Sequence, residues 1–155
     1  MKKITALVLV FAIALVLVAC GDNASTKEEK SKEKKVEKDF EGEYSDMGAG
    51  EIVISTPSGT SEDGNVPVLF TAKDDLLIDI GLDTYEFDGS KLSYVYVDGM
   101  ENDKNQFAET QATIGLMKAD LKPGKHKVEV VQYDNDKPDG NVVTYKVAYY
   151  EAKEK

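Results

Sequence analysis

Seven short runs in which apolar and polar residues alternate constrain the fold of this chain more than any other feature of its sequence. Alternation with a period of two sends successive side chains to opposite faces of an extended strand, so one face is buried and the other is solvated. Val128 and Val130, for example, alternate with Lys127 and Glu129. The seven runs are Glu51–Thr56, Val66–Thr71, Leu76–Leu82, Leu92–Asp98, Gln111–Met117, His126–Tyr133 and Val142–Tyr150.

Turn-forming residues separate these runs. Pro57-Ser58-Gly59, Asp88-Gly89 and Lys122-Pro123-Gly124 are three of the connectors, and Gly, Pro, Asp and Asn each favour a turn for a separate steric or hydrogen-bonding reason. No long segment with a helical period of 3.6 follows residue 38. Short strands in close succession with turns between them predict an all-β sandwich of about seven antiparallel strands.

The sequence between Gly50 and Ala152 resembles a bacterial immunoglobulin-like domain. The resemblance rests on the segments EIVISTP, GNVPVLFTA, KLSYVYVDG, ADLKPGKHKVEVVQYDND and GNVVTYKVAYY, and its most specific part runs from Leu121 to Val128. It implies an immunoglobulin-like β-sandwich in which His126 stands close to the position of a tyrosine corner. The chain has no Trp and a single Cys, so the Trp and paired Cys of antibody domains are absent.

The first twenty residues predict an export signal. Met1-Lys2-Lys3 is a short cationic start, and Ile4 to Leu17 follows without a charge. This run is shorter than the roughly 20 residues that a membrane-spanning helix needs, and it has the length of the apolar core of a signal peptide.

Residues 17–21 read Leu-Val-Ala-Cys-Gly and resemble the lipobox of bacterial lipoproteins. The resemblance implies that a signal peptide of residues 1–19 is cleaved between Ala19 and Cys20, and that the Cys20 thiol receives a diacylglycerol group. Two acyl chains give stable anchoring, whereas one is marginal. We therefore expect a lipid-anchored protein on the extracytoplasmic face of the cell membrane, in a cell of the Gram-positive type.

Residues 20–38 are expected to form a disordered, charged linker between the lipid and the domain, because the stretch KEEKSKEKKVEK cannot bury an apolar core. Residues 39–155 would form the domain. This part has 11 Lys against 24 Asp and Glu, a net charge of −13. Anionic lipid head groups would repel it, so the domain should stand away from the bilayer.

Composition excludes several classes of function. The chain has 19 Lys and no Arg with a net charge of −10, so binding to nucleic acid is not expected. One Cys and one His exclude a disulfide scaffold, a Cys-based zinc site and a two-His metal site. Carboxylate pairs are plentiful, but acid–base catalysis needs a concave, partly apolar site that shifts a pKa. We expect a protein that is not an enzyme.

A face rich in tyrosine is the candidate binding surface. If Val95, Val97, Val128 and Val130 point into the core, then alternation sends the side chains between them to the opposite face. Exposed clusters of Tyr are typical of binding surfaces. Ordinary cross-strand pairing that stabilises the sheet is the alternative, as is a register shifted by one residue, which would turn the side chains inward. The candidate residues are Tyr94, Tyr96, Val131 and Tyr133, with Tyr150 from the last strand.

Two further features have competing interpretations. His126 could act as a pH switch, but a hydrogen-bonded His that begins an inward-facing column with Val128 and Val130 is favoured. Asp134, Asp136 and Asp139 could supply oxygen ligands to calcium. The loop does not follow the EF-hand pattern, since Pro is at its fifth position. The same residues suit a hairpin, and the acidic loop Asp98–Asp103 is similar.

These observations predict a membrane-anchored lipoprotein that acts as a non-enzymatic binding or interaction module at the cell surface. Its partner could be another protein, an envelope polymer or a phage component, and no cofactor other than the lipid is expected. The alternative is a calcium-binding or structural accessory domain of the cell envelope.

Overall fold

The computed structural model describes Phe40 and residues 44–155 of the 155-residue chain. The predicted signal peptide 1–19, the predicted lipidation site Cys20 and the predicted charged linker 20–38 lie outside the described residues.

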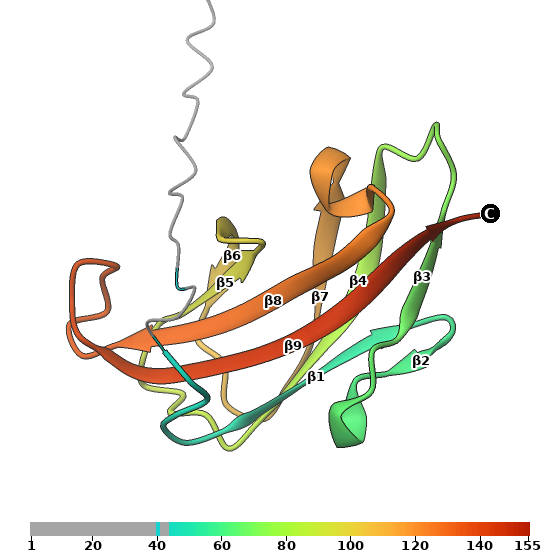
Figure 1. The fold of residues 1–155 in the computed structure, drawn as a ribbon. Coiled ribbons are helices and arrows are strands. Elements are labelled where there is room, and N and C mark those ends of the chain that lie inside the picture. Colours follow the sequence, from blue (N-terminus) through green and yellow to red (C-terminus); the bar gives the residue numbers. More distant parts are fainter. Residues whose placement is uncertain (1–39, 41–43) are drawn as a thin grey trace, which may run out of the picture. The chain divides into compact units, whose positions relative to one another are not determined.

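Two β-sheets form the described part of the chain (Figure 1). The first sheet has the strand order β2 (Gly59–Thr60), β1 (Glu51–Thr56), β4 (Leu77–Tyr85) and β7 (Thr110–Met117). The second has the order β3 (Val68–Thr71), β9 (Val142–Glu154), β8 (Gly124–Tyr133), β5 (Ser93–Val97) and β6 (Met100–Asn105). Two short 3-10 helices, η1 (Glu62–Gly64) and η2 (Lys118–Leu121), lie in connections between strands. The predicted all-β sandwich is confirmed.

All seven predicted runs contain a strand, and the structure adds two more strands. β2 has only two residues, too few to show alternation. β6 reads MENDKN and is an edge strand, where charged residues discourage pairing with other chains, so no apolar pattern marks it. The expectation of purely antiparallel pairing is wrong in one place, because β3 runs parallel to the end of β9. That pairing extends β9 four residues beyond Tyr150, to Glu154.

The main hydrophobic core lies between the two sheets. Val95 and Val97 of β5 and Val128 and Val130 of β8 all point into it and are at most 1% exposed. The alternation seen in the sequence therefore predicts the inward face of the five-stranded sheet correctly. From the opposite sheet, the core receives Ile54, Ile80, Leu82, Ile114 and Leu116.

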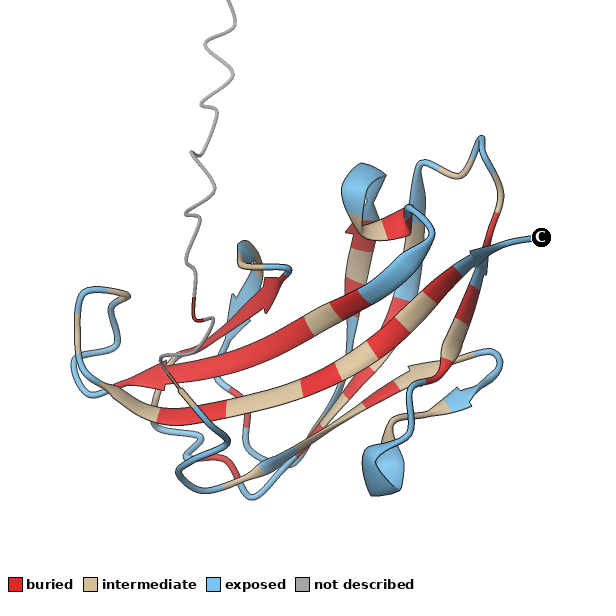
Figure 2. Cartoon of the chain, viewed as in Figure 1, coloured by how far each residue is buried: buried red, intermediate tan, exposed pale blue. Residues whose placement is uncertain are grey.

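The five-stranded sheet is buried on its second face as well. Every residue of β5 is buried, and so are Val128 to Tyr133 of β8, which Figure 2 shows as a long unbroken stretch of buried residues on β8. A strand that is buried on only one face would alternate between buried and exposed residues. Something therefore covers the face that points away from the four-stranded sheet.

Candidate functional site

Four of the five candidate binding residues lie together on the outer face of the five-stranded sheet. Tyr94 is paired with Val131 across β5 and β8, and both belong to a hydrophobic cluster separate from the inter-sheet core. We call this cluster the outer cluster. Its buried members are Phe40, Tyr94, Tyr96, Val131, Tyr133 and Tyr145, and Tyr44, Leu92, Val142 and Val147 pack against them.

The expectation that these tyrosines are exposed is wrong. Tyr96 and Tyr133 are 0% exposed and Tyr94 is 6% exposed. The ring of Phe40 covers Tyr96, with 5.2 Å between the ring centroids, and the Tyr94 hydroxyl donates a hydrogen bond to the Asp136 carbonyl at 2.9 Å. The chain thus covers this apolar face with its own segment before β1 and with the loop between β8 and β9.

The segment that leads into β1 is held against β9 by backbone contacts. Met47 and Tyr145 exchange two backbone hydrogen bonds of 3.0 Å. Gly48 has a φ of +76°, and a Cβ atom there would overlap the backbone of Val143 and Thr144. Tyr44 lies beside Tyr145, with 5.9 Å between the ring centroids. We call residues 44–48, together with Phe40, the strap.

Tyr150 is not part of the outer cluster, which corrects its assignment as a binding residue. It lies in the inter-sheet core, 0% exposed, and its hydroxyl donates to the Asp120 carbonyl at 2.7 Å. β9 places Tyr149 and Tyr150 on opposite faces, and Tyr150 pairs with His126 rather than with an outward residue.

Glu129 is a buried carboxylate that alternation had marked as solvated. It is 0% exposed on the outer face of β8. Its Oε1 accepts a hydrogen bond from the Tyr145 hydroxyl at 2.6 Å and lies 3.0 Å from the Lys127 ammonium. Its Oε2 has no hydrogen-bond partner among the described residues. A charged residue flanked by Val128 and Val130 reads as an outward polar position, so no sequence signal reveals this burial.

The outer cluster shifts the titration of its tyrosines. Burial raises the pKa of Tyr133 well above the usual range, and the hydrogen bond with Tyr96 raises it further. Burial likewise raises the pKa of Tyr145, with a second contribution from the hydrogen bond to Glu129. Both side chains therefore remain neutral donors at any physiological pH.

His126 is a hydrogen-bonded corner residue, as favoured from the sequence. Its Nδ1 lies 2.6 Å from Asp98 Oδ2 and its Nε2 lies 2.7 Å from the Lys122 carbonyl. Both contacts are hydrogen bonds when both ring nitrogens carry a proton. The His126 ring stacks on the ring of Tyr150, with 5.0 Å between the centroids. His126 therefore connects the beginning of β8 to the inter-sheet core. The pH switch stays the less favoured alternative.

The candidate calcium ligands are engaged in hydrogen bonds within their own loop. Asp134 accepts from the backbone and side-chain nitrogens of Asn141 at 3.0 and 2.8 Å, and these bonds help to lower the pKa of Asp134. Asp136 accepts from the Leu92 amide at 3.0 Å, and Asp139 accepts from Asn135 at 3.1 Å. Within the part of the chain that the structure describes, no group of three or more His, Cys, Asp or Glu is arranged to hold a metal ion. Calcium binding stays a prediction.

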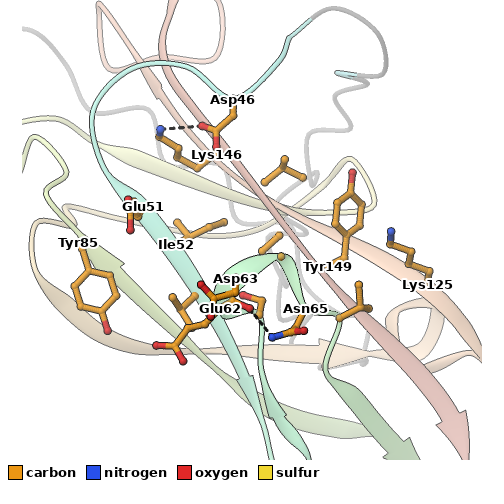
Figure 3. Close-up of a pocket in the computed structure, with 16 residues that line it drawn as sticks. Asp46, Glu51, Ile52, Glu62, Asp63, Asn65, Tyr85, Lys125, Lys146 and Tyr149 are labelled. Atoms are coloured by element: carbon orange, nitrogen blue, oxygen red, sulfur yellow. Dashed lines mark hydrogen bonds and ion pairs between the residues drawn. The ribbon is translucent and has the colours of Figure 1, made fainter.

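A groove of about 930 Å³ lies along the open side of the sandwich, between β1 and β9 (Figure 3). Ile52 of β1 and Tyr149 of β9 lie on its two walls. Lys146 pairs with Asp46 at 2.8 Å at one end, and the residues of η1 lie at the other. Lys125 lies 3.9 Å from the centre of the Tyr149 ring, a cation–π contact. Sequence reasoning missed this groove because its walls come from strands about ninety residues apart.

In the described residues, none of the helices has the length and apolar character that crossing a membrane requires. Comparisons of the chain with protein-family models, with curated proteins and with solved structures found no match.

Proposed function

We propose that this chain is a membrane-anchored, extracytoplasmic lipoprotein whose domain is an immunoglobulin-like, non-enzymatic binding module. The strand order supports the family. In the first sheet, β1, β4 and β7 are adjacent in the manner of strands A, B and E, and β6, β5, β8 and β9 follow the order C′, C, F and G. β3 joins the second sheet beside the last strand, so the first part of the chain is shared between the two sheets.

The sequence of residues 1–21 supports the anchor. Replacing Cys20 with Ala removes the thiol that would accept the diacylglycerol group, so the variant should lose metabolically incorporated fatty acid and should not be processed normally. Ser25→Ala, a change of one atom just beyond the expected cleavage site, is the control and should be labelled normally. A Cys20→Ala protein that still carries labelled acyl chains would contradict the anchor.

The groove between β1 and β9 is the observation that carries the binding function. The groove is a concave surface where apolar side chains such as Ile52 and Val147 lie beside charged ones, and ligands commonly bind in such concave sites. The outer cluster, by contrast, is closed by the strap. We therefore place the contact surface of the module in the groove rather than on the tyrosine face.

Binding of the purified, labelled protein to intact cells tests this function. Tyr149→Ala removes a large side chain from the groove wall, and loss of such an anchor typically costs ~2 kcal/mol or more of binding free energy. Phe70→Ala is the matched control, because Phe70 is an exposed aromatic residue outside the groove. Equal capture of both variants and the unmodified protein would contradict a binding role for the groove.

A further inference from the structure

Among the described residues, no strand is hydrogen-bonded to five residues of β9 on the groove side. The edge is occupied on either side of this gap: Tyr145 pairs with Met47, and β3 pairs with β9 from Glu151 onward. The gap therefore spans residues 146–150, a length of about 17 Å for an extended chain.

The backbone hydrogen bonds show which groups the gap leaves open. The Tyr145 amide and carbonyl both bond to Met47, and the Glu151 amide donates to the Pro67 carbonyl at 3.0 Å. In an antiparallel ladder, alternate residues direct their backbone groups to the same side. Val147 and Tyr149 lie between Tyr145 and Glu151 at this spacing, so their amides and carbonyls point into the groove. None of these four groups has a hydrogen-bond partner among the described residues.

The opposite wall of the groove has the same character. The amide and carbonyl of Ile54 point away from β4, since they bond to Ser61 at 2.8 Å in each case. Ile52 precedes Ile54 by two residues, so its amide and carbonyl face the groove as well.

The groove edge also lacks the protection that the other edge of the same sheet has. β6, at that other edge, includes Glu101, Asp103 and Lys104, and such charges are a common means of preventing strand addition. The stretch of β9 in the gap begins with Lys146, which is paired with Asp46, and continues with the apolar and aromatic residues Val147-Ala148-Tyr149-Tyr150. A largely apolar edge without a paired strand can accept an added strand, whereas the charged side chains of β6 oppose strand addition.

We propose that the groove binds an extended polypeptide segment of another protein, which adds to the edge of β9 as a further strand. This rests on the proposed function as a binding module and names the chemistry of its partner. Donors and acceptors two residues apart on β9 repeat every ~6.8 Å, which is the repeat of an extended peptide backbone. A segment of about five residues would make four hydrogen bonds, with Val147 and Tyr149, and would turn small apolar side chains inward toward Ala148 and Ile52.

The probe is a peptide selected from a displayed library of random heptapeptides on the full chain in detergent micelles. Selection should enrich sequences with alternating apolar residues. Hydrogen exchange at single-residue resolution should then show slowed exchange of the Val147 and Tyr149 amides when the synthetic peptide is added. The Ala148 amide, which points toward β8, should be unaffected. A bound peptide that leaves the Val147 and Tyr149 amides unprotected would overturn the proposal, and so would a library that yields no binder.

Val147→Pro provides a second test. The substitution removes one of the amide donors. A proline can be accommodated at this position because no described residue accepts a hydrogen bond from the Val147 amide. Peptide affinity should fall by at least about tenfold, the equivalent of one good hydrogen bond. Thr113→Pro is the matched control: it places a proline at an outward-facing amide of the exposed edge strand β7, and affinity should be unchanged. Equal affinity in Val147→Pro and the unmodified chain would overturn the proposal.

The cell-binding assay separates this proposal from the proposed function. If intact cells capture Val147→Pro as well as the unmodified protein while Tyr149→Ala is not captured, the groove is the binding site but its partner is not an added strand. If none of these variants differs from the unmodified protein, the proposed function itself fails.

Discussion

The two faces of the five-stranded sheet are both buried, but they are buried by different means. The inner face packs against a second sheet with mainly aliphatic side chains, and the residues that meet there come from strands throughout the domain. The outer face is covered by the short strap and by one loop, and its side chains are mainly tyrosines. Alternation in a sequence thus distinguishes the two faces of a strand, but it cannot show whether a distant segment covers the second face.

The outer face offers hydrogen-bond partners to the hydroxyl groups of its tyrosines. Each buried phenol must keep its hydroxyl hydrogen-bonded, and partners lie at hand on this face. Tyr96 and Tyr133 share a hydrogen bond of 3.3 Å between their hydroxyls, and Tyr145 donates to Glu129.

The largest difference between the faces should appear in Phe107→Ala. Phe107 is 1% exposed in the inter-sheet core, where the two sheets cannot close around the missing ring. We expect the free energy of unfolding to fall by about 3–5 kcal/mol, measured by urea denaturation. A loss below about 1 kcal/mol would mean that the inter-sheet core is more adaptable than its packing indicates.

Phe40→Ala makes the same chemical change on the outer face. Phe40 is 3% exposed, but the strap that carries it can shift toward the tyrosines, so the residual cavity should be smaller. We expect a loss of about 2 kcal/mol in the same urea experiment. Phe70→Ala, at a residue that is 49% exposed, serves as the control and should change stability by less than about 0.5 kcal/mol. Equal losses in Phe40→Ala and Phe107→Ala would remove the distinction between the two faces.

Alkaline pH should destabilise the domain through its buried tyrosines, among them Tyr133 and Tyr145 of the outer face. Burial raises the pKa of Tyr133 and Tyr145 above the unfolded value of about 10. The folded state therefore holds these protons where the unfolded state releases them, so stability is unaffected below about pH 10 and falls as the pH rises further. Urea denaturation between pH 8 and 11 measures this fall, which should be shallower in Tyr145→Phe. A slope that Tyr145→Phe does not change would show that this phenol is not buried.

The smallest effect is expected where the loop between β8 and β9 covers the outer face. Tyr94→Phe removes the hydrogen bond to the Asp136 carbonyl and leaves the ring in place. The free energy of unfolding should fall by about 1 kcal/mol, with little change in the slope against urea. No measurable loss of stability would mean that the hydrogen bond between Tyr94 and this loop does not stabilise the fold.

Much of the fold follows from local patterns, and the exceptions have physical causes. Turn residues and alternation locate seven strands and give the correct direction of Tyr94, Tyr96, Val131 and Tyr133. β6 escapes notice because a charged edge strand has no apolar face. The run ending Tyr149-Tyr150 offers two equivalent rings, and only the pairing of Tyr150 with His126 decides which of them enters the core.

The candidate site was less predictable than the fold because it depends on contacts between distant segments. The strap precedes the first strand, yet it covers Tyr96 and Tyr145, which lie about fifty and one hundred positions later in the chain. The groove likewise exists only once β1 and β9 have taken their places in separate sheets. Neither arrangement leaves a pattern within any one stretch of sequence, and the same holds for the burial of Glu129.

Nitration of tyrosines under native conditions tests most directly whether the strap closes the outer face. Tetranitromethane modifies phenols that solvent reaches, and mass spectrometry of peptides gives the rate at each position. Tyr85, which is 42% exposed, should react quickly in the full chain, whereas Tyr96, Tyr133 and Tyr145 should be protected until Phe40 is replaced by Ala. If Tyr96 or Tyr133 of the unmodified protein is nitrated as fast as Tyr85, the outer face is not closed and these tyrosines are exposed to solvent.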